Sequence, residues 1–179
     1  MIRNNVFMQA YNAQAVVSED QIVVAHGVTN APTDVEHLAP MLERVRENSG
    51  QLPRIVSADS GYLSEKNITY CAKNGIDAYV AAGKATAAKL TGVPDSEALL
   101  AQWAMHDKVT SARGKKIYAR RKVIVEPVFG QIKSAMGFRR FSLRGLLKVP
   151  SEWAIVCACH NLLKLFRLKD SQRLTAAPG

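Results

Sequence analysis

The stretch RIVSADSGYLSEKNITYCAKNGIDAYVA, residues 54–81, decides the fold class that the sequence predicts. Residues 54–58 are too few for a helix and indicate a strand. A helix is then expected to begin at Ser64 and to end at Asn74-Gly75, and a second strand is expected over residues 76–81. Because a strand, a helix and a strand follow one another, we expect parallel pairing and an α/β sheet.

Two more strands and a helix are expected before this stretch. Residues 6–17 and 21–28 indicate strands that are separated by a tight Ser-Glu-Asp turn. The segment Asn30-Ala-Pro-Thr-Asp is typical of a helix start, with Thr33 or Asp34 as N-cap. The helix should end near residues 48–50, and its apolar stripe comprises Val35, Leu38, Met41, Leu42 and Val45.

The second half of the chain is expected to be mostly helical. Residues 83–110 are rich in Ala, with Gly and Pro between, and suggest an inserted helical segment. A long helix is expected over residues 116–136, which contain Pro127. Two interpretations of this proline stay open: it lies in the first turn of a helix that begins near Glu126, or it kinks a longer helix.

One domain is expected over residues 1–168, since 179 residues suffice for a single core. Its last element is a strongly apolar helix over residues 151–168, capped by Ser151 and packed on the sheet. Residues 169–179 are expected to form a disordered tail.

The charge of the chain favours a polyanionic partner. The net charge is +9, and Lys and Arg gather between Lys115 and Lys148, where Glu126 is the only acidic residue. Aromatic and basic residues alternate over residues 138–144, FRRFSLR. As a nucleic-acid contact, this run would combine phosphate binding with base stacking. The alternative is that both Phe side chains pack inward and the Arg side chains are solvated.

Composition narrows the class of protein further. Hydrophobic residues make up 47% and charged residues 22%, as in soluble globular proteins. We find no apolar run long enough to cross a membrane and no signal peptide. The three cysteines suggest no disulfide framework, so we expect a cytoplasmic protein. Cys157 and Cys159 diverge on a helix, which favours buried small residues over a metal site.

Two carboxylates are candidates for catalytic chemistry. Asp59 follows an expected strand, at the sheet edge where α/β proteins bind ligands, although it is also a natural turn or N-cap residue. Glu126 stands between Val125 and Val128, which predicts a position beside the core, where an unpaired carboxylate is costly. Lys133 follows two helical turns later and would hold a phosphate on the same face. Asp and Glu are typical ligands of a pair of Mg²⁺ ions that act on a phosphodiester.

Three segments together give a family resemblance. They are YNAQAVVSEDQIVVAHGVTNAPTDVEHLAPML, SADSGY and RRKVIVEPVFGQIKSAMGFRRFSLRGL, and the similarity runs from Tyr11 to about Phe166. The chain resembles bacterial insertion-sequence transposases of the DDE class. That resemblance implies an RNase H-like fold, a mixed sheet flanked by helices. It also implies an Asp, Asp, Glu triad that holds two Mg²⁺ or Mn²⁺ ions.

The resemblance assigns roles residue by residue. Asp59 matches the second aspartate of the triad and Glu126 the glutamate. Lys133 matches a lysine that follows this glutamate with six residues between, and Tyr118 matches a tyrosine of the same signature. The family signature also has an arginine four residues before this glutamate. Here that arginine is shifted or replaced, since Lys122 lies four residues before Glu126. The expected DNA-binding residues are Lys133, Arg139, Arg140, Arg144, Arg121 and Lys122.

The first aspartate of the triad has no match in this sequence. MIRNNVFMQA contains no acidic residue, and Asp20 lies in an expected turn. We therefore expect an N-terminally truncated domain whose first strand is largely missing. Such a chain should be inactive and should self-associate through unpaired strand edges. The alternative that Asp34 takes the role of the missing first aspartate stays open.

The function implied by the resemblance is DNA transposition. Hydrolysis would free a 3′-hydroxyl at the ends of the element, and this hydroxyl would then attack target DNA. The expected partner is therefore double-stranded DNA, as transposon ends and as target. Two other interpretations stay open: a non-catalytic DNA-binding fragment and a decayed remnant without function.

Overall fold

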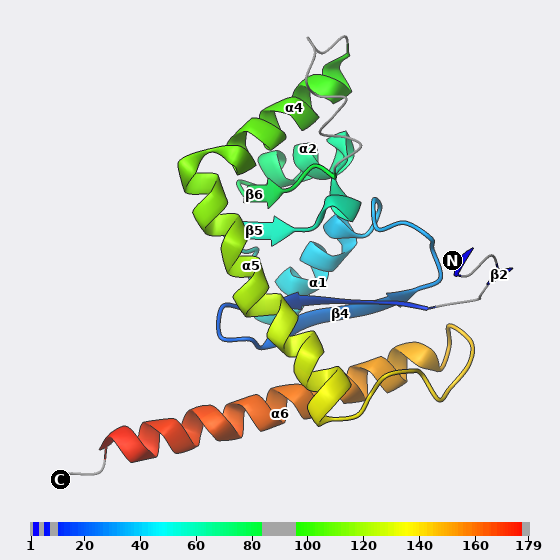
Figure 1. The fold of residues 1–179 in the computed structure, drawn as a ribbon, viewed down its shortest axis with the longest axis vertical. Helices are drawn as coiled ribbons and strands as arrows, with labels where there is room; N and C mark the ends of the chain where they lie inside the picture. The colour runs from blue at the N-terminus through cyan, green and yellow to red at the C-terminus, as the bar shows by residue number, and fades with distance from the viewer. Residues whose placement is uncertain (1, 4–5, 8–10, 84–95, 177–179) are drawn as a thin grey trace. The chain divides into compact units, whose positions relative to one another are not determined.

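The computed structural model describes residues 2–3, 6–7, 11–83 and 96–176. The chain divides into two compact units. Unit 1 combines Met1–Asn30 with Ile124–Gly179, and unit 2 comprises Ala31–Val123. Each unit contains strands and helices, labelled in Figure 1. The α/β class expected from the sequence is therefore confirmed.

The strands of unit 1 form antiparallel pairs. β3 (Asn12–Val17) pairs with β4 (Val23–Thr29), so that Asn12 lies opposite Thr29. The turn between them is closed by a 2.8 Å hydrogen bond from the Ser18 N–H to the Ile22 carbonyl. This hairpin confirms a strand in the second half of the predicted range 6–17, the strand predicted over 21–28, and the tight turn between them, while residues 8–10 lie outside the described part. β1 (Ile2–Arg3) and β2 (Val6–Phe7) form a second, short pair.

The core of unit 1 lies between this hairpin and α6 (Val149–Ala176), which packs on β4 (Figure 1). Its buried apolar side chains are Val23, Val128, Ile132, Trp153, Val156 and Cys157. Packing of the last helix on strands was predicted. The predicted cap was wrong, because α6 begins at Val149 and Ser151 lies inside its first turn. The helix also continues to Ala176, further than the predicted residue 168.

The strands of unit 2 are parallel. β5 (Ile55–Ala58) pairs with β6 (Asp77–Val80), in the register Ile55 to Asp77. α2 (Glu65–Lys73) connects them, and the Ser64 hydroxyl caps this helix by accepting the Asn67 N–H at 3.2 Å. The predicted strand, helix, strand order and its parallel pairing are thus confirmed.

α1 (Leu38–Ser49) begins later than the sequence predicted. Neither Thr33 nor Asp34 is its N-cap; that position belongs to His37, whose side chain makes no capping bond. Residues 34–37 instead form a separate turn, closed by a 3.0 Å bond from the His37 N–H to the Asp34 carbonyl. Val35 therefore precedes the helix and is exposed, whereas the other predicted stripe residues are buried. The end at Gly50, with φ 78°, agrees with the prediction.

Two successive helices follow in the second half. α4 (Glu97–Thr110) confirms helix in the predicted insertion, of which residues 84–95 lie outside the described part. α5 (Ala112–Gly130) has Pro127 in its interior, so the interpretation that a helix begins near Glu126 was wrong. A π-helical segment, Gln131–Ala135, continues from it.

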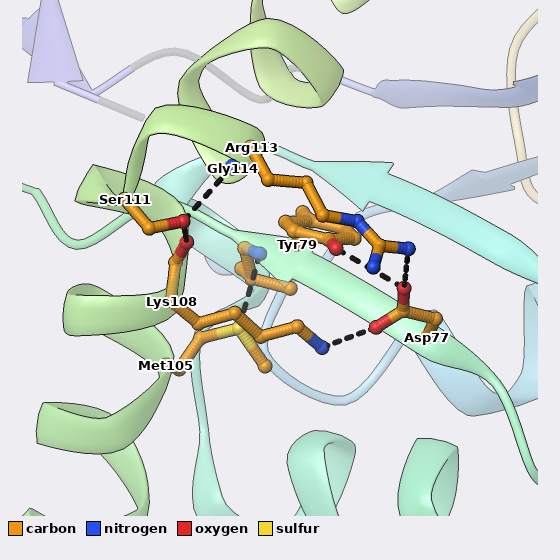
Figure 2. A network of polar contacts seen from close by, with 8 residues as sticks. Asp77, Tyr79, Met105, Lys108, Ser111, Arg113 and Gly114 are labelled. Carbon is orange, nitrogen blue, oxygen red and sulfur yellow. Dashed lines mark hydrogen bonds and ion pairs between the residues drawn. The ribbon is translucent and has the colours of Figure 1, made fainter.

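A network of polar contacts connects α4 with β6 inside unit 2 (Figure 2). The Asp77 carboxylate pairs with the Lys108 ammonium at 2.5 Å and with the Arg113 guanidinium at 3.6 Å, and it accepts a 3.1 Å bond from the Tyr79 hydroxyl. The Lys108 ammonium also lies 4.6 Å from the centre of the Tyr79 ring. The hydrogen bond from Lys108 is the main cause that lowers the pKa of Asp77. Asp77 is therefore a structural carboxylate.

The described strands form three sheets of two strands each. A single mixed sheet of RNase H type thus stays a prediction from the family resemblance. Among the described helices, none combines the length and the apolar character that crossing a membrane requires.

Candidate active site

Asp59 directly follows β5 and begins a short 3-10 turn, Ser60–Tyr62. Its Oδ1 accepts the Gly61 N–H at 3.1 Å, so Asp59 also has the turn role that the sequence left open. Half of the side chain is exposed. The carboxylate therefore stands at the carboxyl end of a parallel strand and is accessible to a ligand, as the sequence predicted.

Arg121, on α5, is the charged neighbour of Asp59 within unit 2. Its guanidinium lies 4.0 Å from Asp59 Oδ2 and 5.5 Å from the centre of the Tyr118 ring. Only 23% of the Arg121 side chain is exposed. In this arrangement Arg121 compensates the Asp59 charge, while its neighbour Lys122 is exposed. A DNA contact is therefore sterically simpler for Lys122 than for Arg121.

Glu126 lies on α5 and is exposed, although Val128 two residues later is fully buried. The sequence argument for a carboxylate beside the core, where its charge would be costly, was therefore wrong. The reason is that the apolar stripe of α5 passes through Val128 without including Glu126. Its role as a metal ligand stays a prediction that rests on the family signature alone.

Lys133 lies in the π-helical segment and is exposed. Its ammonium is 5.9 Å from the centre of the Phe129 ring. The segment shows the expected longer hydrogen-bond step, from the Met136 N–H to the Gln131 carbonyl at 3.0 Å. Because a π-turn holds more residues than an α-turn, seven positions no longer guarantee a common face with Glu126. That part of the prediction stays untested.

The aromatic and basic run 138–144 resolves into an inner and an outer side. The Phe138 and Phe141 rings pack on each other, 5.3 Å between centroids, and both lie against Trp153. Arg139, Arg140 and Arg144 are exposed. The interpretation that the Phe side chains pack inward is confirmed, so stacking of DNA bases on these rings was a wrong expectation. Phosphate contacts by the arginines remain open.

Two residues that the sequence analysis did not single out hold this run in place. The Glu152 carboxylate accepts the backbone N–H groups of Ser142 at 2.8 Å and Leu143 at 2.9 Å. These bonds, that of Leu143 first, lower the pKa of Glu152. The Tyr11 hydroxyl accepts the Gly145 N–H at 2.6 Å. The sequence contains a signal for the role of Glu152. It is an acidic residue in the first turn of a helix, directly after a basic loop.

Cys157, Cys159 and His160 lie on α6 in different environments. Cys157 is buried, as expected, whereas Cys159 is exposed, so the expectation of a buried small residue was wrong for Cys159. The His160 ring is buried, and its Nε2 bonds with the Gln21 carbonyl at 3.0 Å. Both the His160 and the Asn161 side chains bond the backbone of the hairpin. Within residues 11–83 and 96–169, no three His, Cys, Asp or Glu side chains cluster as metal ligands would.

Comparison with known proteins identifies the family. The chain matches the family model described as a transposase DDE domain over residues 4–162. No curated protein and no solved structure matches it significantly. Since the match covers most of the chain, the protein belongs to the transposases with a DDE domain. Cleavage of DNA linked to transposition is the activity of such a domain, and these enzymes generally use divalent metal ions.

Proposed function

We propose that this DDE transposase chain carries part of a site for DNA cleavage and strand transfer by two-metal phosphoryl transfer. The observation that carries the proposal is the position of Asp59, an exposed carboxylate at the carboxyl end of β5, in a chain that matches the family over residues 4–162. Asp59 and Glu126 would be the metal ligands. The RNase H-like arrangement of the strands belongs to the same proposal.

Asp59 and Glu126 have side chains that are suitable ligands for a hard divalent cation. Both are carboxylates with exposed side chains, which Mg²⁺ and Mn²⁺ favour as ligands. The Gly61 N–H holds one oxygen of Asp59 and thereby orients the group. When bound, the metal ions would activate the nucleophile and stabilise the leaving oxygen. The task of Asp59 and Glu126 is to hold that charge beside the phosphodiester.

The exposed cations of unit 1 would position the DNA backbone. The side chains of Lys133, Arg139 and Arg140 are all exposed. The Arg139 Nε–H donates a 3.4 Å bond to the Lys133 carbonyl, which keeps these two residues together. Phosphate contacts of this kind fix orientation without reading sequence. Arg144 would join them, as would Lys122 and Arg121 of unit 2.

Salt-dependent DNA binding tests these contacts. The binding constant for a short duplex should fall with salt concentration, and Arg139→Ala and Arg140→Ala should each reduce the slope of the logarithmic plot by about 1. Arg167→Ala, on an exposed arginine of α6, is the matched control and should leave the slope unchanged. Equal slopes for all three variants would show that Arg139 and Arg140 do not contact DNA.

The activity of the isolated chain is a separate part of the proposal. No residue of this sequence matches the first aspartate of the family, so we infer that the chain by itself does not cleave DNA. Supercoiled plasmid incubated with the chain and Mg²⁺ or Mn²⁺ should stay intact. Nicking that is lost in Asp59→Asn and Glu126→Gln, but retained in the control Glu47→Gln, would contradict inactivity and support both metal ligands.

A non-catalytic DNA-binding fragment is the second candidate function. It is favoured by the exposed arginines of residues 139–144. Binding of duplex DNA that ignores Mg²⁺ and survives both Asp59→Asn and Glu126→Gln would support it. Failure of the chain to fold or to accumulate in cells would instead indicate a remnant without function.

Self-association is proposed through the exposed face of α6. Large apolar side chains on this helix are solvent-exposed at Ile155, Leu162, Leu163 and Phe166. These positions recur at helical spacing and form one stripe, which favours association with another apolar surface. Sedimentation should show oligomers for the unmodified chain and a shift to monomer for Leu162→Gln combined with Phe166→Gln. An unchanged distribution would exclude this face.

A further inference from the structure

Two adjacent leucines lie on an exposed turn of unit 1. The turn comprises residues 145–148, Gly-Leu-Leu-Lys, in the loop between the π-helical segment and α6 (Figure 1). Leu147 is 95% exposed and Leu146 is 45% exposed. The next most exposed large apolar residues of the described part of the chain reach 65%. A single exposed leucine is ordinary, but two in one turn form an apolar tip that the packing of unit 1 does not use.

The backbone of this turn is ordered. The Lys148 N–H donates to the Gly145 carbonyl at 3.1 Å and closes the turn. Gly145 has a φ of 86°, in the left-handed region that favours glycine. Its N–H donates to the Tyr11 hydroxyl at 2.6 Å, and the Tyr11 ring packs edge-on against Phe141, with 5.9 Å between the ring centroids. The apolar tip is therefore attached to the residue that precedes β3.

The loop before the turn is fixed as well. The two Glu152 carboxylate oxygens accept backbone N–H groups, from Ser142 at 2.8 Å and from Leu143 at 2.9 Å. Groups that are ordered before a ligand arrives lose less conformational entropy when they bind it. The leucines of residues 145–148 are thus presented on a preorganised backbone.

Cations surround this apolar tip in the sequence. Residues 127–151 contain no Asp or Glu, and the nearest basic residues, Arg139, Arg140, Arg144 and Lys148, are all exposed. The first carboxylate after them, that of Glu152, is occupied by the backbone of the loop. The loop therefore combines positive charge with an apolar point, which favours a partner that is anionic outside and apolar inside.

Duplex DNA has this combination. Its phosphates lie outside, and its base pairs, stacked about 3.4 Å apart, form an interior between whose steps an apolar side chain can insert. The chain belongs to a transposase family, and the substrate of such enzymes is DNA. An anionic membrane surface is the other partner of this kind, but it is typically bound by the broad apolar face of a helix. Two leucines on a short turn fit a base step better.

We propose that residues 145–148 are a wedge that inserts Leu147, with Leu146 beside it, between neighbouring base pairs of duplex DNA. The inference rests on the proposed phosphate contacts of Arg139 and Arg140, and it adds an apolar contact with the bases. An inserted apolar side chain unstacks the step and kinks the duplex. The arginines would hold the phosphates while the leucine deforms the DNA.

Two short duplexes test the wedge with the full 179-residue chain. One is fully paired, the other has a central mismatch, and both carry 2-aminopurine at the central step. Because a mismatched step is already partly unstacked, the unmodified chain should bind that duplex about fivefold more tightly. Binding should also raise the fluorescence of 2-aminopurine, which increases when the base leaves the stack.

Variants of Leu147 separate an apolar wedge from a general effect of the loop. Leu147→Gln should abolish the preference for the mismatch and the fluorescence increase, while the salt dependence of binding stays the same. Leu147→Met keeps an apolar side chain and should retain both signals. Leu100→Gln, at an exposed leucine of α4, is the matched control and should behave like the unmodified chain. Thermal melts should agree for all variants, since exposed positions contribute little to stability.

The outcomes distinguish failure of this inference from failure of the proposed function. If Leu147→Gln keeps both signals while Arg139→Ala and Arg140→Ala reduce the salt slope, the wedge is wrong and the phosphate contacts stand. The same holds if the unmodified chain binds both duplexes equally and without a fluorescence change. If the unmodified chain binds neither duplex, both the wedge and the proposed DNA contacts fail.

A membrane surface is tested separately. Vesicles of phosphatidylserine and phosphatidylcholine should not sediment the chain. Vesicle binding that Leu147→Gln abolishes, together with equal affinity for the paired and the mismatched duplex, would assign the turn to a lipid surface and overturn the wedge.

Discussion

The side chain of Asn161 on α6 and the backbone of Val23 on β4 exchange two hydrogen bonds across 138 residues of sequence. Asn161 Oδ1 accepts the Val23 N–H at 2.8 Å, and Asn161 Nδ2 donates to the Val23 carbonyl at 2.9 Å. The amide of one side chain thus satisfies both backbone groups of a buried strand residue. It fixes the position of the last helix along the hairpin.

Replacing this amide should destabilise unit 1. Asn161→Ala leaves the N–H and the carbonyl of Val23 without their partner, which costs about 1–3 kcal/mol for each buried polar group that water does not reach. The free energy of unfolding, measured in urea, should fall by at least the lower value. Asn30→Ala, at an exposed position, is the control and should change stability little. Equal stability of both variants would mean that water replaces the Asn161 bonds.

A side chain at Gly114 should be poorly tolerated. A Cβ there would lie 2.0 Å from the Lys108 carbonyl oxygen, a backbone atom that cannot move alone. Gly114→Ala should therefore cost about 3 kcal/mol, at the upper end of the usual range for overpacking, and lower the melting temperature on the order of 10 °C. In contrast, Gly130→Ala meets open space and should be neutral or slightly stabilising. A melt of Gly114→Ala at the normal temperature would show that the α4–α5 junction can rearrange.

The ion pairs of Asp77 should make stability depend on acidic pH. The hydrogen bond from Lys108, chiefly, lowers the pKa of Asp77 in the folded chain. A depressed carboxyl pKa contributes stability above the unfolded-state value of about 3.9, and this contribution is lost as the pH falls through the folded-state pKa. Since Asp77 is about one-third exposed, the contribution should stay below about 1 kcal/mol.

Urea unfolding of the chain and of Asp77→Asn, followed from pH 7 to pH 2.5, measures this contribution. The stability difference between the two should be constant near neutral pH and should shrink below pH 4. High salt should reduce it at neutral pH. A difference that does not depend on pH would indicate a role of Asp77 in packing only.

The two thiols near the middle of α6 should differ strongly in reactivity. Burial raises the pKa of Cys157 to about 12, whereas Cys159 is exposed. Because the thiolate is the reactive form, maleimide should modify Cys159 rapidly and Cys157 only when the chain unfolds. Mass spectrometry of labelled Cys159→Ala should show almost no early modification. Rapid labelling of this variant would mean that α6 opens from the hairpin.

Local patterns predicted most elements because short-range interactions decide them. Ser64 begins α2, Gly50 ends α1, and residues 55–58 form a strand, each as expected from its neighbours in the sequence. The prediction failed where a distant contact competes. Asp34 has the side chain of an N-cap, but its segment is bonded through Asn67 to the turn Ser60–Tyr62, and the N-cap of α1 is His37, three residues later.

The sequence by itself determined the family, the strand and helix types, and the position of Asp59 at the end of a parallel strand, because these depend on motif spacing and local conformation. Only the tertiary structure decided which side chains are exposed and which meet. It packed Phe138 and Phe141 against the core, left Glu126 exposed to solvent, and brought Asp34 next to Asp59. Such juxtapositions depend on packing between segments far apart in the chain, which no local pattern encodes.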